Sequence, residues 1–326
     1  MGEWRYWFAE QKGTLLALGI FVVMFVIYTS NHQAGFTANV VQTASNKGVL
    51  LAFIAMAQTL VVITAGIDLS VGMIFILTNC LASWLVVGTP METALGLLAV
   101  LLAGAACGAI NGLIVIYGRL QPIVATIATG AIYYGLALAL RPVPGGDIDG
   151  SLGDALTGKV FEVMPASLLL LLALVLFVWL PYRRSETGRA AYAIGSAEVA
   201  AYMSGVPTRR AKFAAYTLSG LLAAVAGLFI TCVTSSGEAS AANGNTYTLY
   251  SIAAVVLGGV SLFGGSGSAV GAIFGALMFR TIGDLLFVFD LDPLWQPLFQ
   301  GVVLAAAVCL GALRLLRVRN RLDLYG

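Results

Sequence analysis

The chain has 326 residues, of which 60% are hydrophobic and only 10% are charged. An average soluble domain carries about 25% charged residues, so the composition excludes an ordinary soluble protein and predicts an all-α polytopic membrane protein. The formal net charge is only +2. We expect membrane lipid as the surrounding medium and no nucleic-acid partner.

Apolar stretches of about 20 residues, the length that crosses a bilayer as a helix, recur along almost the whole chain. Residues 1–326 are predicted to form a single transmembrane domain with a short N-terminal segment (1–12), one long loop (182–212) and a basic tail (314–326). Breaks at glycines, prolines and charged clusters predict ten spans: 13–29, 48–65, 70–88, 93–117, 121–140, 165–181, 213–231, 249–263, 268–287 and 295–313.

The basic residues predict the orientation of these spans, because cytoplasmic loops of membrane proteins are enriched in Lys and Arg. With both termini in the cytoplasm, 13 of the 17 basic residues fall on the cytoplasmic side. Acidic residues such as Asp147, Asp149 and Glu162 then lie outside. The long loop 182–212 is therefore predicted to be cytoplasmic.

One acidic residue, Asp68, interrupts the apolar run between Val49 and Leu77, within Gly66–Gly72. A carboxylate at the centre of a membrane helix costs about 2.5–3.5 kcal/mol on insertion scales. Asp68 is thus expected either to cap a helix that begins near Val71 or to face a protein-lined cavity. The break itself fits either a cytoplasmic turn or an interruption inside the membrane.

Several other polar side chains recur at membrane depth in the first half of the chain. They are candidates to line a solute pathway or gate, although helix packing through interhelical hydrogen bonds is an alternative role. Phe75 is added because an aromatic ring can stack on a sugar, although a core position is the alternative. The candidate pathway residues are Gln58, Asp68, Ser70, Phe75, Asn79 and Asn111.

The long loop contains a short predicted helix with both ends marked by sequence. Ser196 is expected to cap it and Glu198 to favour its positive end, Gly205 suits the left-handed position after it, and Pro207 prevents continuation. Such a short helix needs a docking partner. Docking into a soluble protein and resting on lipid headgroups are both open; the residues of this element are Ser196, Glu198, Val199, Ala200, Met203, Ser204 and Gly205.

Glycines are unusually frequent near the break and again between residues 253 and 271. They permit close helix crossings or breaks in a span. The segments Gly66–Phe75 and Gly265–Phe274 match at five of ten positions, so either an internal repeat or chance is possible. The glycines assigned to breaks or packing are Gly66, Gly72, Gly258, Gly259, Gly265 and Gly271.

Arg280 and Asp284 lie four residues apart in the ninth span, a spacing that predicts an ion pair on one helix face. A transporter driven by a proton gradient would be expected to carry a chain of ionisable groups through the membrane. Only Asp68 and this pair are candidates. The scarcity of such groups disfavours that mechanism.

Five blocks along the chain, in the expected order, resemble the ribose-type sugar permeases of ABC importers, within the branched-chain amino acid/ribose superfamily. The likeness runs from about Val40 to Leu310. Ala65 departs from it, standing where a further glycine is usual, as does Ser196-Ala-Glu198, where Gly-Asn-Pro-Glu is more frequent. The blocks are Thr59–Gly72, Gly108–Val115, Pro122–Ala128, Gly188–Gly195 and Ile252–Gly259.

The resemblance implies an ABC importer permease fold in the bacterial cytoplasmic (inner) membrane, working by alternating access. It implies three kinds of partner: a second permease subunit, cytoplasmic ABC ATPases, and an extracytoplasmic sugar-binding protein. In this family the segment Ala197–Ser204 corresponds to the coupling helix that inserts into the ATPase. An ion-gradient-driven sugar or metabolite transporter and a structural or receptor-like multipass protein are the alternatives.

No phosphate-binding loop of the Gly-x-x-x-x-Gly-Lys-Ser/Thr type occurs in the sequence. The chain is therefore predicted not to be an enzyme and to bind no cofactor or metal of its own. ATP and Mg²⁺ would be used by the partner ATPase. The lone histidine, His32, is expected to lie in an external loop.

Overall fold

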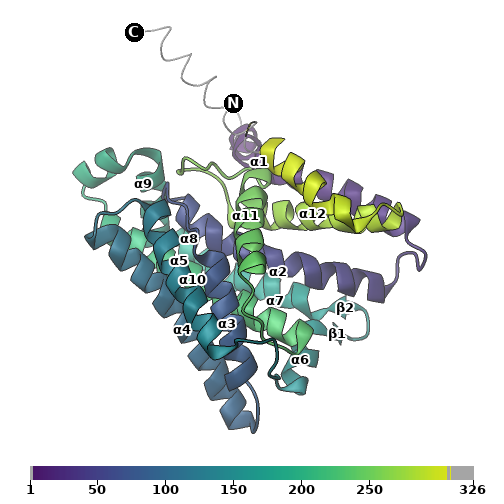
Figure 1. Ribbon diagram of the computed structural model, residues 1–326. Coiled ribbons are helices and arrows are strands. Elements are labelled where there is room, and N and C mark those ends of the chain that lie inside the picture. The colour runs from purple at the N-terminus through teal and green to yellow at the C-terminus, as the bar shows by residue number, and fades with distance from the viewer. Residues whose placement is uncertain (1–2, 307–308, 310–326) are drawn as a thin grey trace.

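The computed structural model describes residues 3–306 and residue 309. Most of this part of the chain is helical, and one short hairpin is its only sheet among the described residues (Figure 1). The elements in order are α1 (Glu3–Asn31), α2 (Ala38–Val62), α3 (Val71–Leu85), α4 (Pro90–Tyr117), α5 (Pro122–Leu140), α6 (Gly150–Thr157), β1 (Lys159–Val160), β2 (Met164–Pro165), α7 (Ala166–Leu174), the π-helix η1 (Val175–Trp179), α8 (Leu180–Arg184), α9 (Glu186–Met203), α10 (Thr208–Thr234), α11 (Ala241–Leu257), α12 (Ala269–Val288) and the 3-10 turn η2 (Pro293–Trp295).

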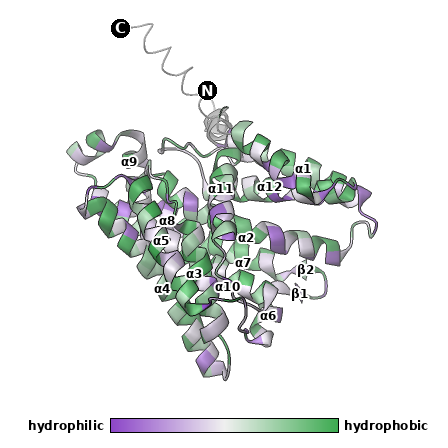
Figure 2. Ribbon diagram, in the orientation of Figure 1, coloured by the Kyte–Doolittle hydropathy of each residue, from purple (hydrophilic) through white to green (hydrophobic). Residues whose placement is uncertain are grey.

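Within the part of the chain that the structure describes, seven helical stretches are long and apolar enough to cross a membrane, which confirms a multi-pass membrane protein. They are α1 from Gln11, α2, α4, α5, the continuous run α7–η1–α8, α10 and α12, while α3 and Gln296–Ala306 are shorter apolar helices. Figure 2 shows hydrophobic residues along most of α4, α5 and α12. The predicted spans overlap these helices and α11, except that 307–308 and 310–313 of the last span lie outside the described residues.

Helix α2 lies at the centre of the molecule, and α1 lies at its edge (Figure 1). In α2, 89% of the most apolar window is buried by protein, against 17% in α1. Helix α10 packs along α2, α3 and α4, and α12 packs on α1, α2 and α11. The apolar surface of α1 is thus left largely for lipid, while α2 is covered on all sides from Gly48 to its end.

The chain leaves helical structure between Val62 and Val71, where the sequence predicted a break. Within this segment Asp68 and Ser70 are fully buried, so it is a protein-covered connection rather than an exposed turn. Ala65 has a left-handed backbone (φ +62°), a conformation that costs a residue with a Cβ about 1–2 kcal/mol. That geometry explains why glycine suits this position better than alanine.

Three backbone segments meet beside the break. The N–H of Gly265 donates to the carbonyl oxygen of Ile63 at 3.0 Å. A Cβ built on Gly195, in α9, would lie 2.0 Å from that oxygen and 2.2 Å from the nitrogen of Gly265. The segment before α3, the glycine loop before α12 and α9 therefore touch through backbone atoms alone, and we call this contact the glycine junction (Gly195, Ile63, Gly264 and Gly265).

Other glycines allow helices to cross at close range. A Cβ on Gly72 would lie 1.9 Å from the carbonyl oxygen of Gly244, so α3 and α11 are in backbone contact. Gly258 and Gly271 approach each other similarly, with built Cβ atoms 2.3 Å from the partner's backbone. Gly259 has φ +81°, a left-handed backbone that glycine adopts without steric cost.

The ion pair expected between Arg280 and Asp284 does not form. Asp284 Oδ1 instead accepts a hydrogen bond from Lys47 Nζ at 3.3 Å, which joins α12 to α2. The local spacing of four residues was correct for a pair on one helix face. Lys47 of α2 pairs with the Asp284 carboxylate instead, and the spacing of residues within α12 carries no information about that neighbouring helix.

Candidate functional site

Asp68 folds back on the start of α3. Its Oδ1 accepts hydrogen bonds from the Ser70 N–H (2.9 Å) and the Ser70 hydroxyl (2.6 Å). The side chain is fully buried, and no ion pair involving it occurs within the described part of the chain. Asp68 therefore satisfies the N–H of Ser70, the N-cap residue of α3, whereas in the first turn the Gly72 N–H donates to Thr248 of α11.

The break is fixed to two more helices by a chain of buried side chains. Asn111 of α4 donates from Nδ2 to Ser70 Oγ (2.7 Å), and its Oδ1 accepts from the Tyr133 hydroxyl of α5 (3.1 Å). Tyr133 also lies 2.9 Å from the Cys107 carbonyl oxygen. The polar network (Asp68, Ser70, Asn111, Tyr133) thus links the break to α4 and α5, and it unites three of the predicted pathway residues.

Gln58 of α2 holds the main chain of Asp68 from the other side. With its amide oriented to satisfy both groups, Nε2 donates to the Asp68 carbonyl oxygen at 2.9 Å and Oε1 accepts from the Asp68 N–H at 3.3 Å. A non-helical segment has no helical partners for these groups, and an unpaired buried amide costs about 1–3 kcal/mol. Gln58 therefore supplies the hydrogen-bond partners for the Asp68 N–H and carbonyl groups that a continuous helix would have supplied.

Three buried oxygens beside the break, Asp68 Oδ2, Tyr216 Oη and Ser219 Oγ, make no hydrogen bond of ordinary length within the described residues, and the Ser219 hydroxyl faces the Asp68 carboxylate. Tyr216 and Ser219 belong to α10, and a Cβ built on Gly66 would lie 3.0 Å from Tyr216 Oη. Buried polar groups in proteins nearly always have a partner, protein or water. The hydroxyl groups of Tyr216 and Ser219 are therefore the polar groups of α10 that lie beside Asp68.

The remaining two candidate pathway residues lie further along α3. Asn79 donates to Thr231 Oγ1 (2.8 Å) and the Ser236 carbonyl oxygen (3.1 Å), and accepts from the Glu238 N–H (2.8 Å). Phe75 is buried against the ring of Tyr247, with centroids 5.2 Å apart. Their contacts join α3 to α10, to the segment that follows it and to α11, and they do not join the network around Asp68.

Helix α9 bends at Ala197, whose φ of −163° and ψ of 94° are not helical. The expected cap by Ser196 is wrong: its hydroxyl donates to the Tyr192 carbonyl oxygen at 3.0 Å, one turn back in the preceding helix. The other end agrees with the prediction, because Gly205 has φ +79° and its N–H donates to the Tyr202 carbonyl oxygen. The second part of α9, residues 198–203, is the short helix that the sequence predicted to couple to an ATPase, and we call it the coupling segment.

The coupling segment presents an apolar surface. Val199 and Met203 are 73% and 81% exposed, with Ala200 also exposed between them, whereas Ala201 is buried against the first part of α9 and α10. Glu198 pairs with Lys212 of α10. Large apolar side chains this exposed at a helix end are typical of a docking surface.

A basic groove of about 330 Å³ runs beside the coupling segment. It is lined by Arg119, Arg209 and Lys212, with Glu198 as the acidic residue, and the Arg209 guanidinium lies 5.9 Å from the centre of the Tyr117 ring. The apolar side chains of the coupling segment are therefore bordered by positive charge.

Four residues that matter to this geometry were not found from sequence: Tyr133, Tyr216, Ser219 and Gly195. The hydroxyls lie in otherwise apolar spans, where a tyrosine or serine is ordinary. Tyr216 and Ser219 lie three residues apart and share a face of α10, which is the one local signal that could have drawn attention to them. Gly195 closes the block Gly188–Gly195, but only the structure shows what it touches.

Comparison with known proteins identifies the family. The family model described as branched-chain amino acid transport system / permease component matches residues 40–308. The chain is 34% identical to the ribose import permease protein RbsC of Escherichia coli strain K12 over 93% of this chain and 94% of that protein. It is 33% identical to RbsC of Bacillus subtilis, with 90% of each chain covered.

A third relative, the fructose import permease protein FrcC of Rhizobium meliloti, is 34% identical over 80% of this chain and 74% of that protein. No solved structure matches the chain. These matches extend over most of its length and confirm the resemblance seen in the sequence blocks. The chain is a multi-pass membrane protein that belongs to the branched-chain amino acid/ribose family of ABC importer permeases.

Proposed function

We propose that this chain is the membrane-spanning subunit of an ATP-driven importer for a sugar or a sugar-like solute in the bacterial cytoplasmic membrane. Ribose and fructose import permeases are about one-third identical to it over most of its length, which supports a sugar as the solute. The distribution of Lys and Arg supports a topology with both termini and the coupling segment in the cytoplasm.

The observation that carries the proposal is the glycine junction. The first part of α9 touches the segment before α3 and the loop before α12 through backbone atoms, and the coupling segment begins directly after it. A displacement of the coupling segment by an ATPase would therefore reach both breaks without passing through flexible side chains. Packed backbones transmit such shifts because they have no slack to absorb them.

The partners of this subunit follow from the same surfaces. The exposed Val199 and Met203 would insert into a groove of the ATPase, which binds ATP and Mg²⁺, and the basic groove would meet acidic residues beside it. A second permease subunit would complete the pathway, and an extracytoplasmic binding protein would deliver the solute. This chain would perform no catalysis and bind no cofactor.

Alternating access is the proposed mechanism. The polar network and the hydroxyl groups of Tyr216 and Ser219 would lie beside the pathway at the break, where they would offer hydrogen bonds to the hydroxyl groups of a passing solute. Motion of the coupling segment would change the packing of α3 and α12 and so expose this region to one side at a time.

Transport in proteoliposomes tests the proposal. The full chain is reconstituted with its ATPase and binding protein, and uptake of radiolabelled sugar is measured with and without ATP. We expect uptake to require both ATP and the binding protein and to survive a protonophore. Uptake that needs neither and collapses when the proton gradient is dissipated would instead identify an ion-gradient-driven transporter. Mass spectrometry of the ligand retained by the binding protein would identify the solute.

A further inference from the structure

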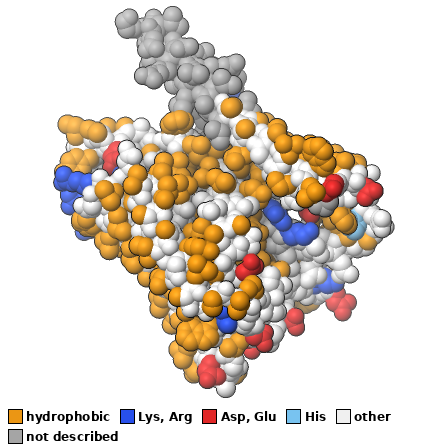
Figure 3. Space-filling model, viewed as in Figure 1, with side chains coloured by type: hydrophobic (Ala, Val, Ile, Leu, Met, Phe, Trp, Pro, Cys, Tyr) orange, Lys and Arg blue, Asp and Glu red, His pale blue; other side chains and the backbone are white. Residues whose placement is uncertain are grey.

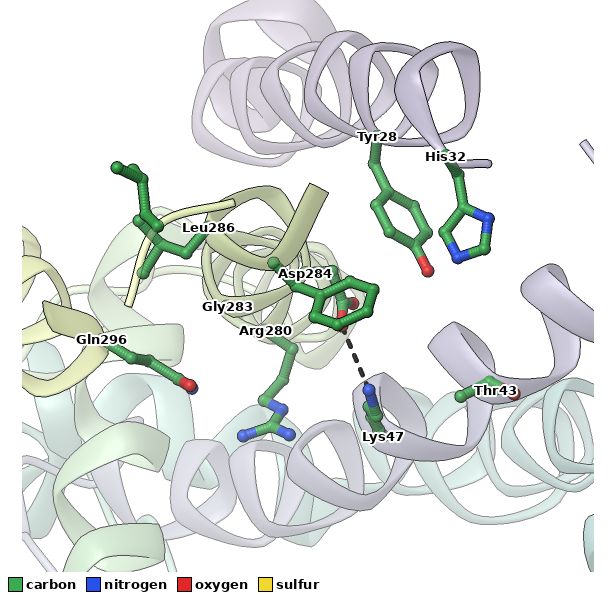
Figure 4. Close-up of a pocket in the computed structure, with 11 residues that line it drawn as sticks. Tyr28, His32, Thr43, Lys47, Arg280, Gly283, Asp284, Leu286 and Gln296 are labelled. Carbon is green, nitrogen blue, oxygen red and sulfur yellow. Dashed lines mark hydrogen bonds and ion pairs between the residues drawn. The ribbon is translucent and has the colours of Figure 1, made fainter. Parts of the chain in front are cut away.

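A second polar cavity lies far from the coupling segment, where the ends of α1, α2 and α12 meet (Figure 4). Its volume is about 390 Å³. In Figure 1 this corner is at the right of the molecule, opposite α9. Residues from all three helices line it, including Tyr28, His32, Lys47, Arg280, Asp284 and Gln296.

The cavity has an excess of positive charge. Lys47 and Arg280 are two cations against a single carboxylate, Asp284, which is already paired with Lys47. Arg280 has no ion pair with any described residue, and its buried Nε lacks a hydrogen-bond partner there. Figure 4 shows Asp284 directed at Lys47 and the Arg280 guanidinium directed away from both. One cation therefore lacks a counter-ion inside the protein.

An unpaired arginine within a membrane span is energetically costly, so such a residue normally faces a partner or a polar cavity. The planar guanidinium offers parallel N–H donors that match a phosphate or a carboxylate. Lys47 lines the cavity from α2 and can add a second positive charge to the same ligand. An anionic group with several acceptor oxygens is the chemistry that this cavity lacks.

The rim of the cavity indicates where the anion comes from. Phe287 and Leu291 line it and are 71% and 43% exposed. Figure 3 shows basic side chains in a hollow beneath the hydrophobic surface of α1 and α12. A charged hollow bordered by exposed apolar side chains, in a protein surrounded by lipid, suits a phosphate that is attached to acyl chains.

We propose that this cavity binds the phosphate of an anionic phospholipid, with Arg280 and Lys47 as its ligands and the acyl chains lying on the exposed apolar rim. The bound lipid would supply the missing counter-ion of Arg280. It would also bridge α12 to α2 beside the Lys47–Asp284 ion pair.

Native mass spectrometry of the full chain in detergent tests this assignment, with phosphatidylglycerol and phosphatidylcholine as competing lipids. We expect the wild-type chain to retain phosphatidylglycerol in preference to phosphatidylcholine. Arg280→Gln and Lys47→Gln should each lower that retention about fivefold or more, since one basic residue near a membrane surface contributes about 1 kcal/mol. The matched control is Arg210→Gln, an exposed arginine at the start of α10, which should retain phosphatidylglycerol as the wild type does.

Three results would overturn the proposal. Equal retention of phosphatidylglycerol by wild type and both cavity variants would remove the cavity as the lipid site. If inorganic phosphate raised the thermal unfolding midpoint of the purified chain as much as phosphatidylglycerol does, the cavity would be a site for a free anion and not for a lipid. If Arg280→Gln cannot be purified, Arg280→Lys keeps the charge without the guanidinium fork, and we expect it to lower retention; retention unchanged in both Arg280→Lys and Lys47→Gln would contradict the assignment.

Discussion

The backbone of Gly195 lies against the carbonyl oxygen of Ile63, so closely that a Cβ at position 195 would be 2.0 Å from that oxygen. Ile63 belongs to the break before α3, whereas Gly195 lies two residues before the bend that begins the coupling segment. The helix that leads into the proposed ATPase-binding segment is thus in direct contact with the break before α3, which we propose moves in response to the ATPase.

Gly195→Ala should therefore uncouple the transporter. The added methyl group must displace the backbone of Ile63 or Gly265, and overpacking of this kind costs about 1–3 kcal/mol. We expect ATP-dependent uptake in proteoliposomes to fall well below that of wild type, while the ATPase still co-purifies. Gly135→Ala is the control, because nothing lies within 4 Å of a Cβ there; equal uptake by both variants would mean that the contact transmits nothing.

Replacing Val199 and Met203 together by aspartate should release the ATPase. Both side chains are exposed in this chain, so the replacements need not disturb its own fold, but they place charges where an apolar groove must close. Affinity should fall about 30-fold or more, measured by co-purification and by surface binding. Phe161→Asp, at a 93% exposed position in the β1–β2 turn, is the control for added charge; a complex that survives the double replacement would contradict the coupling assignment.

Asn111→Leu should lower the stability of the chain, because it removes the hydrogen bond that joins α4 to the break before α3. The change leaves Ser70 Oγ without its donor and Tyr133 Oη with one acceptor fewer. Interhelical hydrogen bonds in membrane proteins contribute about 0.6 kcal/mol each on average, so we expect a loss of about 1–2 kcal/mol in thermal unfolding. Tyr133→Phe removes the hydroxyl that donates to Asn111 and Cys107 but keeps the bond between Asn111 and Ser70, so it should cost less than Asn111→Leu. A loss of similar size in both variants would show that the two bonds do not contribute separately.

Ala65→Gly should stabilise the chain, a direction opposite to that of most substitutions. Ala65 has φ +62°, and glycine removes the steric cost of a Cβ in this conformation, a gain of about 1 kcal/mol. The increase should appear as a higher midpoint of thermal unfolding. Ala193→Gly within α9 provides the contrast, because glycine inside a helix destabilises by about 0.5–1 kcal/mol.

Sequence reasoning succeeded where the physical signal is local. Apolar length predicts the membrane helices, and an acid among glycines predicts the break at Asp68, because both depend on adjacent residues. It also selected Ser70 and Asn111, which proved to be bonded to each other.

Sequence reasoning failed where the partner of a side chain comes from a part of the chain that the local pattern does not reveal. Arg280 and Asp284 have the right spacing to pair, but Lys47 from α2 takes the carboxylate. Ser196 has the right chemistry to cap a helix, but its hydroxyl is used by the preceding turn and the bend falls at Ala197. The spacing of Tyr216 and Ser219 places them on one face of α10, but nothing local shows that this face meets the break.

The burial of α2 has a consequence for how the chain is made. Helix α2 is covered largely by α10 and α12, which are synthesised long after it. Until α10 leaves the ribosome, Gln58 and Asp68 must remain in the membrane, or in the insertion machinery, without the helix that encloses them. The order of synthesis therefore makes α10 the element that encloses the break, and nascent chains that end before Thr208 should be retained by the insertion machinery or degraded.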